Sequence, residues 1–159
     1  MRPFVALSLL VFSLVGCSTP YQRKGFTGGF SDSRIDASTF LVEFKGNGAT
    51  SQQTVQTYLL YRCAELTAEA GYDYFILAGA DTGAEHLSIA MPGHYSGTTT
   101  GSAGFATTTG TYTPGPVLPV TKFNASVIIK TFHGEKPADN PAAFNAKEVL
   151  QYLGPTVRR

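Results

Sequence analysis

Hydrophobic residues recur every three or four positions in residues 50–71, which is the spacing of one face of an α-helix. Thr50 and Gln53 have the spacing of a capping box, which satisfies free amide groups at the start of a helix. Gly71 stands where a left-handed residue commonly ends a helix. The apolar positions are Val55, Tyr58, Leu59, Leu60, Cys63, Ala64, Leu66 and Ala70. We expect this amphipathic helix to be the element on which the rest of the fold packs.

Strand-like runs lie on both sides of this helix. Residues 39–45 alternate along the chain in a way that indicates a strand with one buried face. Residues 72–78 form a short apolar run of strand length. Strand, helix and strand in this order favour a parallel pair joined by a right-handed crossover. A β-α-β unit is therefore the predicted nucleus of the fold.

The chain that follows this nucleus predicts further strands. Residues 79–83 have the composition of a turn, and residues 85–91 then indicate a third strand antiparallel to the second. Residues 120–132 alternate along a long final strand. We expect a mixed sheet of three or four strands whose apolar face packs on the central helix.

A second helix is expected near the C-terminus. Asn140 is a good N-cap, and Pro141 suits the first helical position. This helix is expected to run through Leu153 and to stop at Gly154 and Pro155. The predicted fold class is therefore α+β, with a single small domain in residues 39–159 that has a β-α-β nucleus, antiparallel extensions and a C-terminal helix.

Residues 86–121 differ from the rest of the chain because they contain no Lys, Arg, Asp or Glu. Two Thr-Thr-Thr-Gly repeats, at residues 98–101 and 107–110, flank Phe105. This echo suits the two arms of an extended hairpin, and the composition equally suits a low-complexity loop. A structureless loop of this length inside a compact domain is uncommon and is often functional or disordered. A disordered or floppy hairpin and a dedicated binding loop at about residues 92–118 are both consistent with the pattern.

The first residues have the organisation of a signal peptide. Arg2 precedes an apolar run of about 12 residues, which is too short for an ordinary membrane-spanning helix. The run ends in Leu14-Val15-Gly16-Cys17, which resembles the bacterial lipobox, a small-residue cleavage site directly before a cysteine. The resemblance implies cleavage between Gly16 and Cys17 and acylation of Cys17 by fatty acids such as palmitate. Two or more acyl chains make a lasting membrane anchor, whereas a single chain holds a protein only marginally.

The lipobox resemblance also implies a location. In diderm bacteria an aspartate after the cysteine often signals retention in the inner membrane, and this chain has Ser18 there. We therefore expect a lipid-anchored protein on the periplasmic face of the outer membrane, or on the cell membrane if the source has a single membrane. Removal of residues 1–16 leaves 11 basic and 11 acidic residues, so charge gives no reason to expect a nucleic-acid partner.

Residues 17–38 are polar and rich in glycine, and no hydrophobic period persists in them. We interpret them as the lipidated cysteine followed by a tether that holds the domain clear of the lipid headgroups. Tyr21, Phe26 and Phe30 make this segment too aromatic for an inert linker. These side chains either dock on the domain or touch a partner.

Four stretches of the mature chain carry a family resemblance. They are TPYQ after the cysteine, FKGNGATS, YLLYRCAELTAEAGYDYFIL, and EKPADNPAAFNAKEVLQYLGP near the C-terminus. Together they resemble a group of small proteobacterial lipoproteins of unassigned function, with a gap over the Thr/Gly segment. The resemblance implies an envelope location and a single small α/β domain, and it brings no catalytic residue. Cys63 stands where members of this family have alanine, which supports a packing role.

No pattern of cysteines and histidines indicates a metal centre. Acylation of Cys17 leaves Cys63 without an intramolecular disulfide partner, and its place on the apolar helix face indicates a small buried hydrophobe. His86, His94 and His133 show no metal-ligand spacing with one another or with Cys63. We therefore expect no resident metal and no cofactor.

The chain also lacks the pattern of a hydrolase. Asp81, His86 and Ser88 can be nominated as a triad, but His86 and Ser88 would merely share one face of a strand. No GxSxG elbow, Walker loop or dinucleotide-binding glycine pattern is present. We therefore expect no enzymatic activity.

Two functions remain consistent with these patterns. The first is a non-enzymatic envelope lipoprotein that acts by contact with another envelope component, which is a protein or peptidoglycan. The second is a sensor or carrier on the periplasmic face that binds a small ligand or a metal, with His86, His94 and Cys63 as its candidate residues. The candidate contact residues, which could stack on sugars, are Tyr95, Phe105 and Tyr112.

Overall fold

The computed structural model describes residues 18–102 and 105–159, and its contacts divide into two units. The first unit comprises the chain up to Glu85 together with Lys122–Arg159, and the second is His86–Thr121. The first unit has a sheet with helices packed on it, and the second contains a two-stranded hairpin. The predicted α+β class is therefore confirmed. The predicted signal peptide, with its cleavage site and Cys17, lies outside the described residues.

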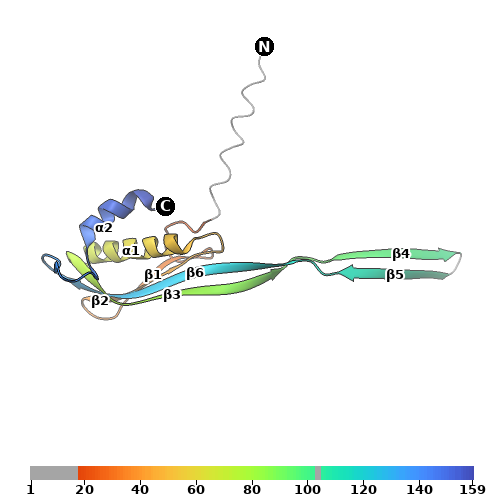
Figure 1. Ribbon diagram of the computed structural model, residues 1–159, viewed down its shortest axis with the longest axis horizontal. Helices are drawn as coiled ribbons and strands as arrows, with labels where there is room; N and C mark the ends of the chain where they lie inside the picture. The colour runs from red at the N-terminus through yellow and green to blue at the C-terminus, as the bar shows by residue number, and fades with distance from the viewer. Residues whose placement is uncertain (1–17, 103–104) are drawn as a thin grey trace, which may run out of the picture. The chain divides into compact units, whose positions relative to one another are not determined.

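Five strands form the main sheet: β1 (Gly29–Arg34), β2 (Thr39–Lys45), β3 (Tyr74–Ala90), β6 (Val117–Phe132) and β7 (Ala143–Asn145). Their order is β1-β2-β6-β3-β7, and the sheet is antiparallel (Figure 1). β2 and β3 run in the same direction, as predicted for a β-α-β unit, but they do not pair with each other, because β6 lies between them. β6 takes this place by pairing with the whole of β2, from Thr39 opposite Lys130 to Lys45 opposite Asn124. The sheet therefore has more strands than the three or four predicted, and it is not mixed.

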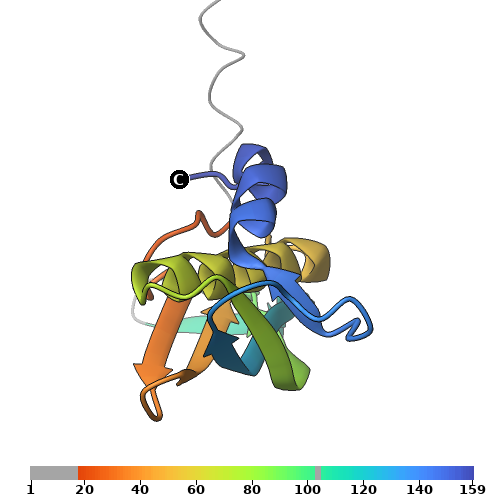
Figure 2. The ribbon, with the colours of Figure 1, turned by 90° about the vertical axis from the view of Figure 1, so that its left-hand side faces the viewer.

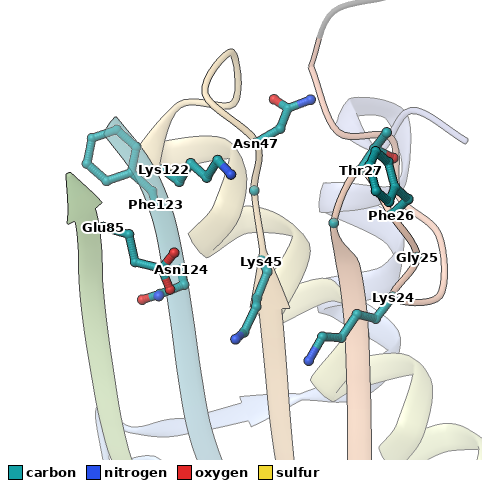
Figure 3. A pocket seen from close by; sticks show the side chains of 12 residues that line it. Lys24, Gly25, Phe26, Thr27, Lys45, Asn47, Glu85, Lys122, Phe123 and Asn124 are labelled. Carbon is teal, nitrogen blue, oxygen red and sulfur yellow. The ribbon is translucent and has the colours of Figure 1, made fainter. Parts of the chain in front are cut away.

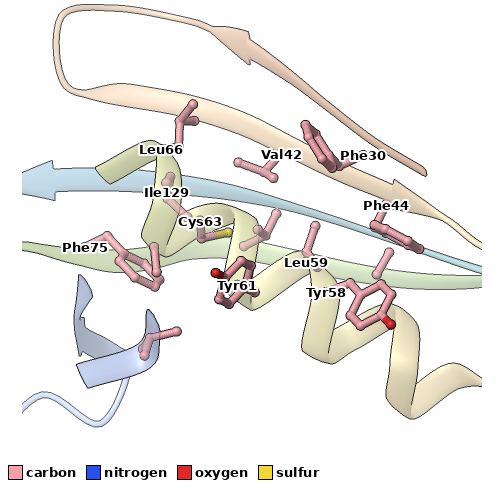
Figure 4. Close-up of a cluster of buried hydrophobic side chains, with 14 of the residues drawn as sticks. Phe30, Val42, Phe44, Tyr58, Leu59, Tyr61, Cys63, Leu66, Phe75 and Ile129 are labelled. Atoms are coloured by element: carbon pink, nitrogen blue, oxygen red, sulfur yellow. The ribbon is translucent and has the colours of Figure 1, made fainter. Parts of the chain in front are cut away.

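Helix α1 (Gln52–Glu69) covers one face of the sheet, and α2 (Ala146–Leu153) packs on α1 (Figure 2). The core lies where α1 meets the sheet, and Phe44, Phe75 and Ile129 are completely buried there (Figure 4). Cys63 of α1 is also completely buried in this cluster. The apolar helix face predicted from the hydrophobic spacing therefore forms the centre of the core.

The start of α1 differs from the predicted capping box. Ser51 is the N-cap, and its hydroxyl oxygen accepts a hydrogen bond from the amide of Thr54 at 3.1 Å. Thr50 is buried, and its Oγ1 accepts a hydrogen bond from the amide of Thr19 at 2.8 Å. Thr50 is thus occupied by a partner distant in sequence, which no local pattern reveals. Gly71 has a left-handed φ of 83° after the helix, as predicted.

β3 is one continuous strand, so the predicted turn at residues 79–83 is wrong. A Cβ at Gly83 would lie 2.5 Å from Oδ1 of Asn124 on β6. Glycine at this position therefore allows a neighbouring side chain to approach the backbone closely and does not mark a turn.

The C-terminal helix begins later than predicted. Asn140 caps a turn, with its Oδ1 accepting a hydrogen bond from the amide of Ala142 at 2.9 Å. The chain then forms β7, and Asn145 is the N-cap of α2, accepting a hydrogen bond from the amide of Glu148 at 3.2 Å. β7 pairs with β3 and places Phe144 on Phe75, with ring centroids 5.6 Å apart. Strand pairing and ring packing therefore override the local helix signal at Asn140.

The segment predicted as a tether is largely part of the fold. It supplies β1, and the side chains of Tyr21 and Phe30 are buried. The ring of Tyr21 packs edge-on against Tyr58 of α1, with centroids 5.6 Å apart. Docking on the domain is therefore confirmed for Tyr21 and Phe30, whereas Phe26 is fully exposed. The buried Thr19 and strand β1 therefore belong to the first unit, although both precede residue 39, where the domain was predicted to begin.

The second unit contains β4 (His94–Ser102) and β5 (Phe105–Thr113), which pair antiparallel. The two threonine repeats lie opposite each other in this pair. Thr99 is paired with Thr108, and their hydroxyl oxygens are 2.9 Å apart. The Thr/Gly segment was predicted to be either an extended hairpin or a low-complexity loop, and it forms the extended hairpin.

Candidate functional site

Two of the three aromatic residues predicted to bind a ligand meet on the hairpin. Tyr95 and Tyr112 are opposite each other in the strand register, so they lie on the same face. Their side chains are 62% and 60% exposed. A Cβ at Gly110 would collide with the ring of Tyr95, and a Cβ at Gly93 would collide with the ring of Tyr112. Each ring therefore lies over a glycine. Phe105 begins β5, and its side chain is not among those described.

Further apolar side chains of the second unit are exposed. Leu87, Ile89 and Met91 occupy alternate positions, which share one face in extended chain, and all three are exposed. Val117 and Leu118 at the start of β6 are exposed as well. Since residues 86–121 carry no charged side chain, this unit presents an uncharged and partly apolar surface. Exposed apolar patches of this kind mark contact sites in soluble proteins.

The candidate metal ligands do not come together. Among the described residues, no group of three or more His, Cys, Asp or Glu side chains could hold a metal ion. His94 begins β4 opposite Thr113, and His133 lies 3.9 Å from a carboxylate oxygen of Asp73. Cys63 is in the core, where burial raises the pKa of its thiol and keeps it protonated. The thiol is therefore neither a ready nucleophile nor a ready ligand.

The nominated triad is not assembled around His86. Nδ1 of His86 lies 3.2 Å from the hydroxyl oxygen of Thr121, which is its described hydrogen-bond partner. Ser88 lies two positions further along β3, and Asp81 belongs to the first unit. This arrangement supplies neither the nucleophile–base contact nor the base–orienter contact that acyl transfer needs.

A buried ion network joins the N-terminal segment to α1. Nε of Arg62 lies 3.0 Å from Asp32 of β1, and Nη1 lies 3.2 Å from Glu65 and 3.0 Å from Glu69. Burial alone would lower the pKa of Arg62, but the hydrogen bonds with Glu69 and Asp32 raise it above its usual value. The hydroxyl of Tyr21 donates a hydrogen bond to Glu65. The hydrophobic spacing of residues 50–71 gave no sign that the charged side chain of Arg62 is buried.

A cavity of about 210 Å³ lies at one end of the sheet, beside the N-terminal segment (Figure 3). Lys24, Lys45 and Lys122 line it, together with Glu85. Phe26 lies on its rim and is fully exposed. We call these three lysines and Phe26 the lysine–phenylalanine patch. Sequence reasoning placed Lys24 and Phe26 in a tether, and only the strand pairing brings Lys45 and Lys122 beside them.

A second cavity of about 210 Å³ lies between α1 and the sheet and is mostly apolar. Its lining includes Leu59, Leu60, Leu77, Val127 and Phe144. This groove is suited to a small apolar group, and it contains none of the predicted histidine ligands.

No family model, curated protein or solved structure matches the chain. None of the helices in the described part of the chain is long and apolar enough to span a membrane.

Proposed function

We propose that the protein is a non-enzymatic lipoprotein of the cell envelope, anchored through acylated Cys17, which acts by contact with another envelope component through the second unit. The observation that carries this proposal is the hairpin itself. It combines exposed Tyr95 and Tyr112 with an entire unit, His86–Thr121, that lacks charged side chains.

The sequence of the first 18 residues supports the lipid anchor. An apolar run after Arg2 leads to Leu14-Val15-Gly16-Cys17, and Ser18 follows the cysteine. The proposed location is the periplasmic face of the outer membrane, or the cell membrane in a source with one membrane. The resemblance to small proteobacterial lipoproteins supports the same compartment.

The contact role is supported by the physics of a two-stranded hairpin. Isolated hairpins are marginally stable in water, and exposed strand edges without charges are prone to pair with other chains. The described edges of β4 and β5 carry threonine, serine and glycine in place of lysine or proline. We expect this unit to bind an uncharged surface, such as that of an envelope protein or the sugar rings of peptidoglycan.

Site-specific photo-crosslinking in intact cells tests this proposal. A photoreactive residue replaces Tyr112 in one variant and Tyr152 of α2, which is 74% exposed, in the control. We expect a defined crosslinked species from position 112 and none of the same mass from position 152. Equal labelling at the two positions, or no adduct to any protein or glycan at position 112, would contradict a contact role for the hairpin.

A further inference from the structure

Thr19, two residues after the predicted lipidation site, is held firmly in the fold. Thr19 is almost completely buried, and its Oγ1 accepts a hydrogen bond from the amide of Asn47 at 2.9 Å. The same hydroxyl donates to the carbonyl of Thr27 at 2.8 Å. Since consecutive Cα atoms are about 3.8 Å apart, the Cα of Cys17 lies within roughly 8 Å of the Cα of Thr19. A lipid on Cys17 therefore holds this end of the first unit close to the membrane.

Thr19 also fixes a tight turn that exposes an aromatic ring. The amide of Gly25 donates to the carbonyl of Gly28 at 2.9 Å, and Gly28 has a left-handed φ of 106°. Phe26 lies at the tip of this turn, one residue before the carbonyl that Thr19 holds, and its side chain is fully exposed. By chain geometry, Phe26 is within roughly 20 Å of Cys17. A fixed turn thus presents a large apolar side chain near the anchor.

Positive charge lies in the cavity that Phe26 also lines. Lys24 precedes it in the turn, and Lys45 and Lys122 reach the same cavity from β2 and β6 (Figure 3). Glu85 is the acidic residue in the cavity lining, so the lining remains net positive. The mature chain as a whole is balanced, with 11 basic and 11 acidic residues once residues 1–16 are removed. The positive charge is therefore a local feature of this end of the sheet.

We propose that the lysine–phenylalanine patch binds the anionic surface of the membrane in which Cys17 is anchored. An aromatic ring enters the boundary between headgroups and acyl chains, while long lysine side chains extend their ammonium groups to anionic headgroups. The patch and the lipid together make a two-point attachment, which orients the first unit on the bilayer. This inference rests on the proposed lipid anchor and goes beyond it by assigning the face that meets the lipid.

A single-tryptophan experiment tests the patch, because the native chain has no Trp. Phe26→Trp is compared with Ile35→Trp, which replaces an exposed residue just beyond the other end of β1. Both lipidated proteins are purified from membranes and reconstituted in vesicles of phosphatidylethanolamine and phosphatidylglycerol. We expect the indole emission of the Phe26→Trp protein to shift to shorter wavelength and to be quenched by brominated acyl chains, with neither effect for Ile35→Trp. Unquenched, water-exposed emission from Phe26→Trp protein that remains on the vesicles would overturn the patch and leave the anchor standing.

Charge-removal variants test the lysines independently of the lipid. The mature chain with Cys17→Ser retains every described residue, and its partition onto anionic vesicles is measured directly. Removing each lysine of the patch is expected to weaken binding about fivefold, so the triple change Lys24→Gln, Lys45→Gln and Lys122→Gln should largely abolish it. The matched control removes the same charge from three other exposed lysines, by Lys130→Gln, Lys136→Gln and Lys147→Gln.

The two assays separate the patch from the anchor. Equal binding by the two triple variants, or equal binding to anionic and to phosphatidylcholine vesicles, would overturn the patch. If Cys17 carries no lipid in cells, the anchor fails, and the partition of the Cys17→Ser chain alone decides the patch.

Discussion

Arg62 links α1 to the N-terminal segment through a buried ion network. Its guanidinium contacts three carboxylates and lies 4.7 Å from the centroid of the Phe30 ring. The side chain is 5% exposed, so its charge is separated from water and is compensated by protein groups. Removal of one member of such a buried ion network leaves the others with uncompensated charge.

Arg62→Met is therefore expected to lower the free energy of unfolding by about 3 kcal/mol, because Asp32 loses its ion-pair partner, while Glu65 keeps the exposed Arg159 as its partner. Urea unfolding of the mature chain measures this change. The control is Arg34→Met, which removes an exposed arginine whose hydrogen bonds go to the backbone carbonyls of Asp36 and Ala37. The control should cost less than about 1 kcal/mol. A cost for Arg62→Met no greater than that of the control would show that the network contributes no stability.

At the scale of elements, we assign the proposed contact to the hairpin and the stability of the protein to the first unit. Its described side chains are exposed, and the buried core of the protein lies in the first unit. The amide of Met91 donates to the carbonyl of Pro116 at 3.0 Å, so the two chain segments that lead into the hairpin are already paired at that point. A shorter connection can therefore close the chain there.

Replacement of residues 92–115 by Asn-Gly, a two-residue turn suited to hairpins, is expected to leave the unfolding free energy within about 1 kcal/mol of the parent. The contact with the envelope partner should be lost, because Tyr95 and Tyr112 are removed. Thermal unfolding and pull-down of crosslinked membrane protein measure the two effects. A destabilised protein, or a partner retained without the hairpin, would argue against this division of roles.

At the scale of the whole molecule, the predicted lipidation site lies only two residues before Thr19, which is buried in the first unit. The described structure holds Thr19 by hydrogen bonds to Thr50, Asn47 and Thr27. With Cys17 acylated as we propose, this short connection would keep the first unit at the bilayer surface, whereas a long tether would let it sample the space beyond.

Cys17→Ser is expected to abolish labelling by a palmitate analogue and to reduce the share of the protein in the membrane fraction, because the change removes the thiol that we propose is acylated. Metabolic labelling and membrane fractionation of both proteins measure this. An unlabelled parent protein recovered in the soluble fraction would remove the lipid anchor.

Local patterns predicted the elements that are stabilised locally. The apolar spacing around Val55 and Cys63 gave the buried face of α1, and Gly71 marked its end. The echo of threonine repeats suited a hairpin because the two arms pair residue by residue. The lipobox resemblance at Cys17 likewise depends on a few adjacent residues, and the lipidation that it implies stays a prediction.

Tertiary structure alone decided the strand order, the start of each helix and the composition of the surface patches. β6 displaced the predicted parallel pair because its backbone groups satisfy the whole of β2, which is remote in sequence. Thr50 and Asn140 have side chains suited to helix capping, but both form other hydrogen bonds. Ser51 and Asn145 are the N-caps of α1 and α2 instead. Helix periodicity depends on residues a few positions apart, so the sequence by itself determined it. Sheet pairing and the cavity that Phe26 shares with three lysines depend on residues far apart in the chain, so they existed only once the chain had folded.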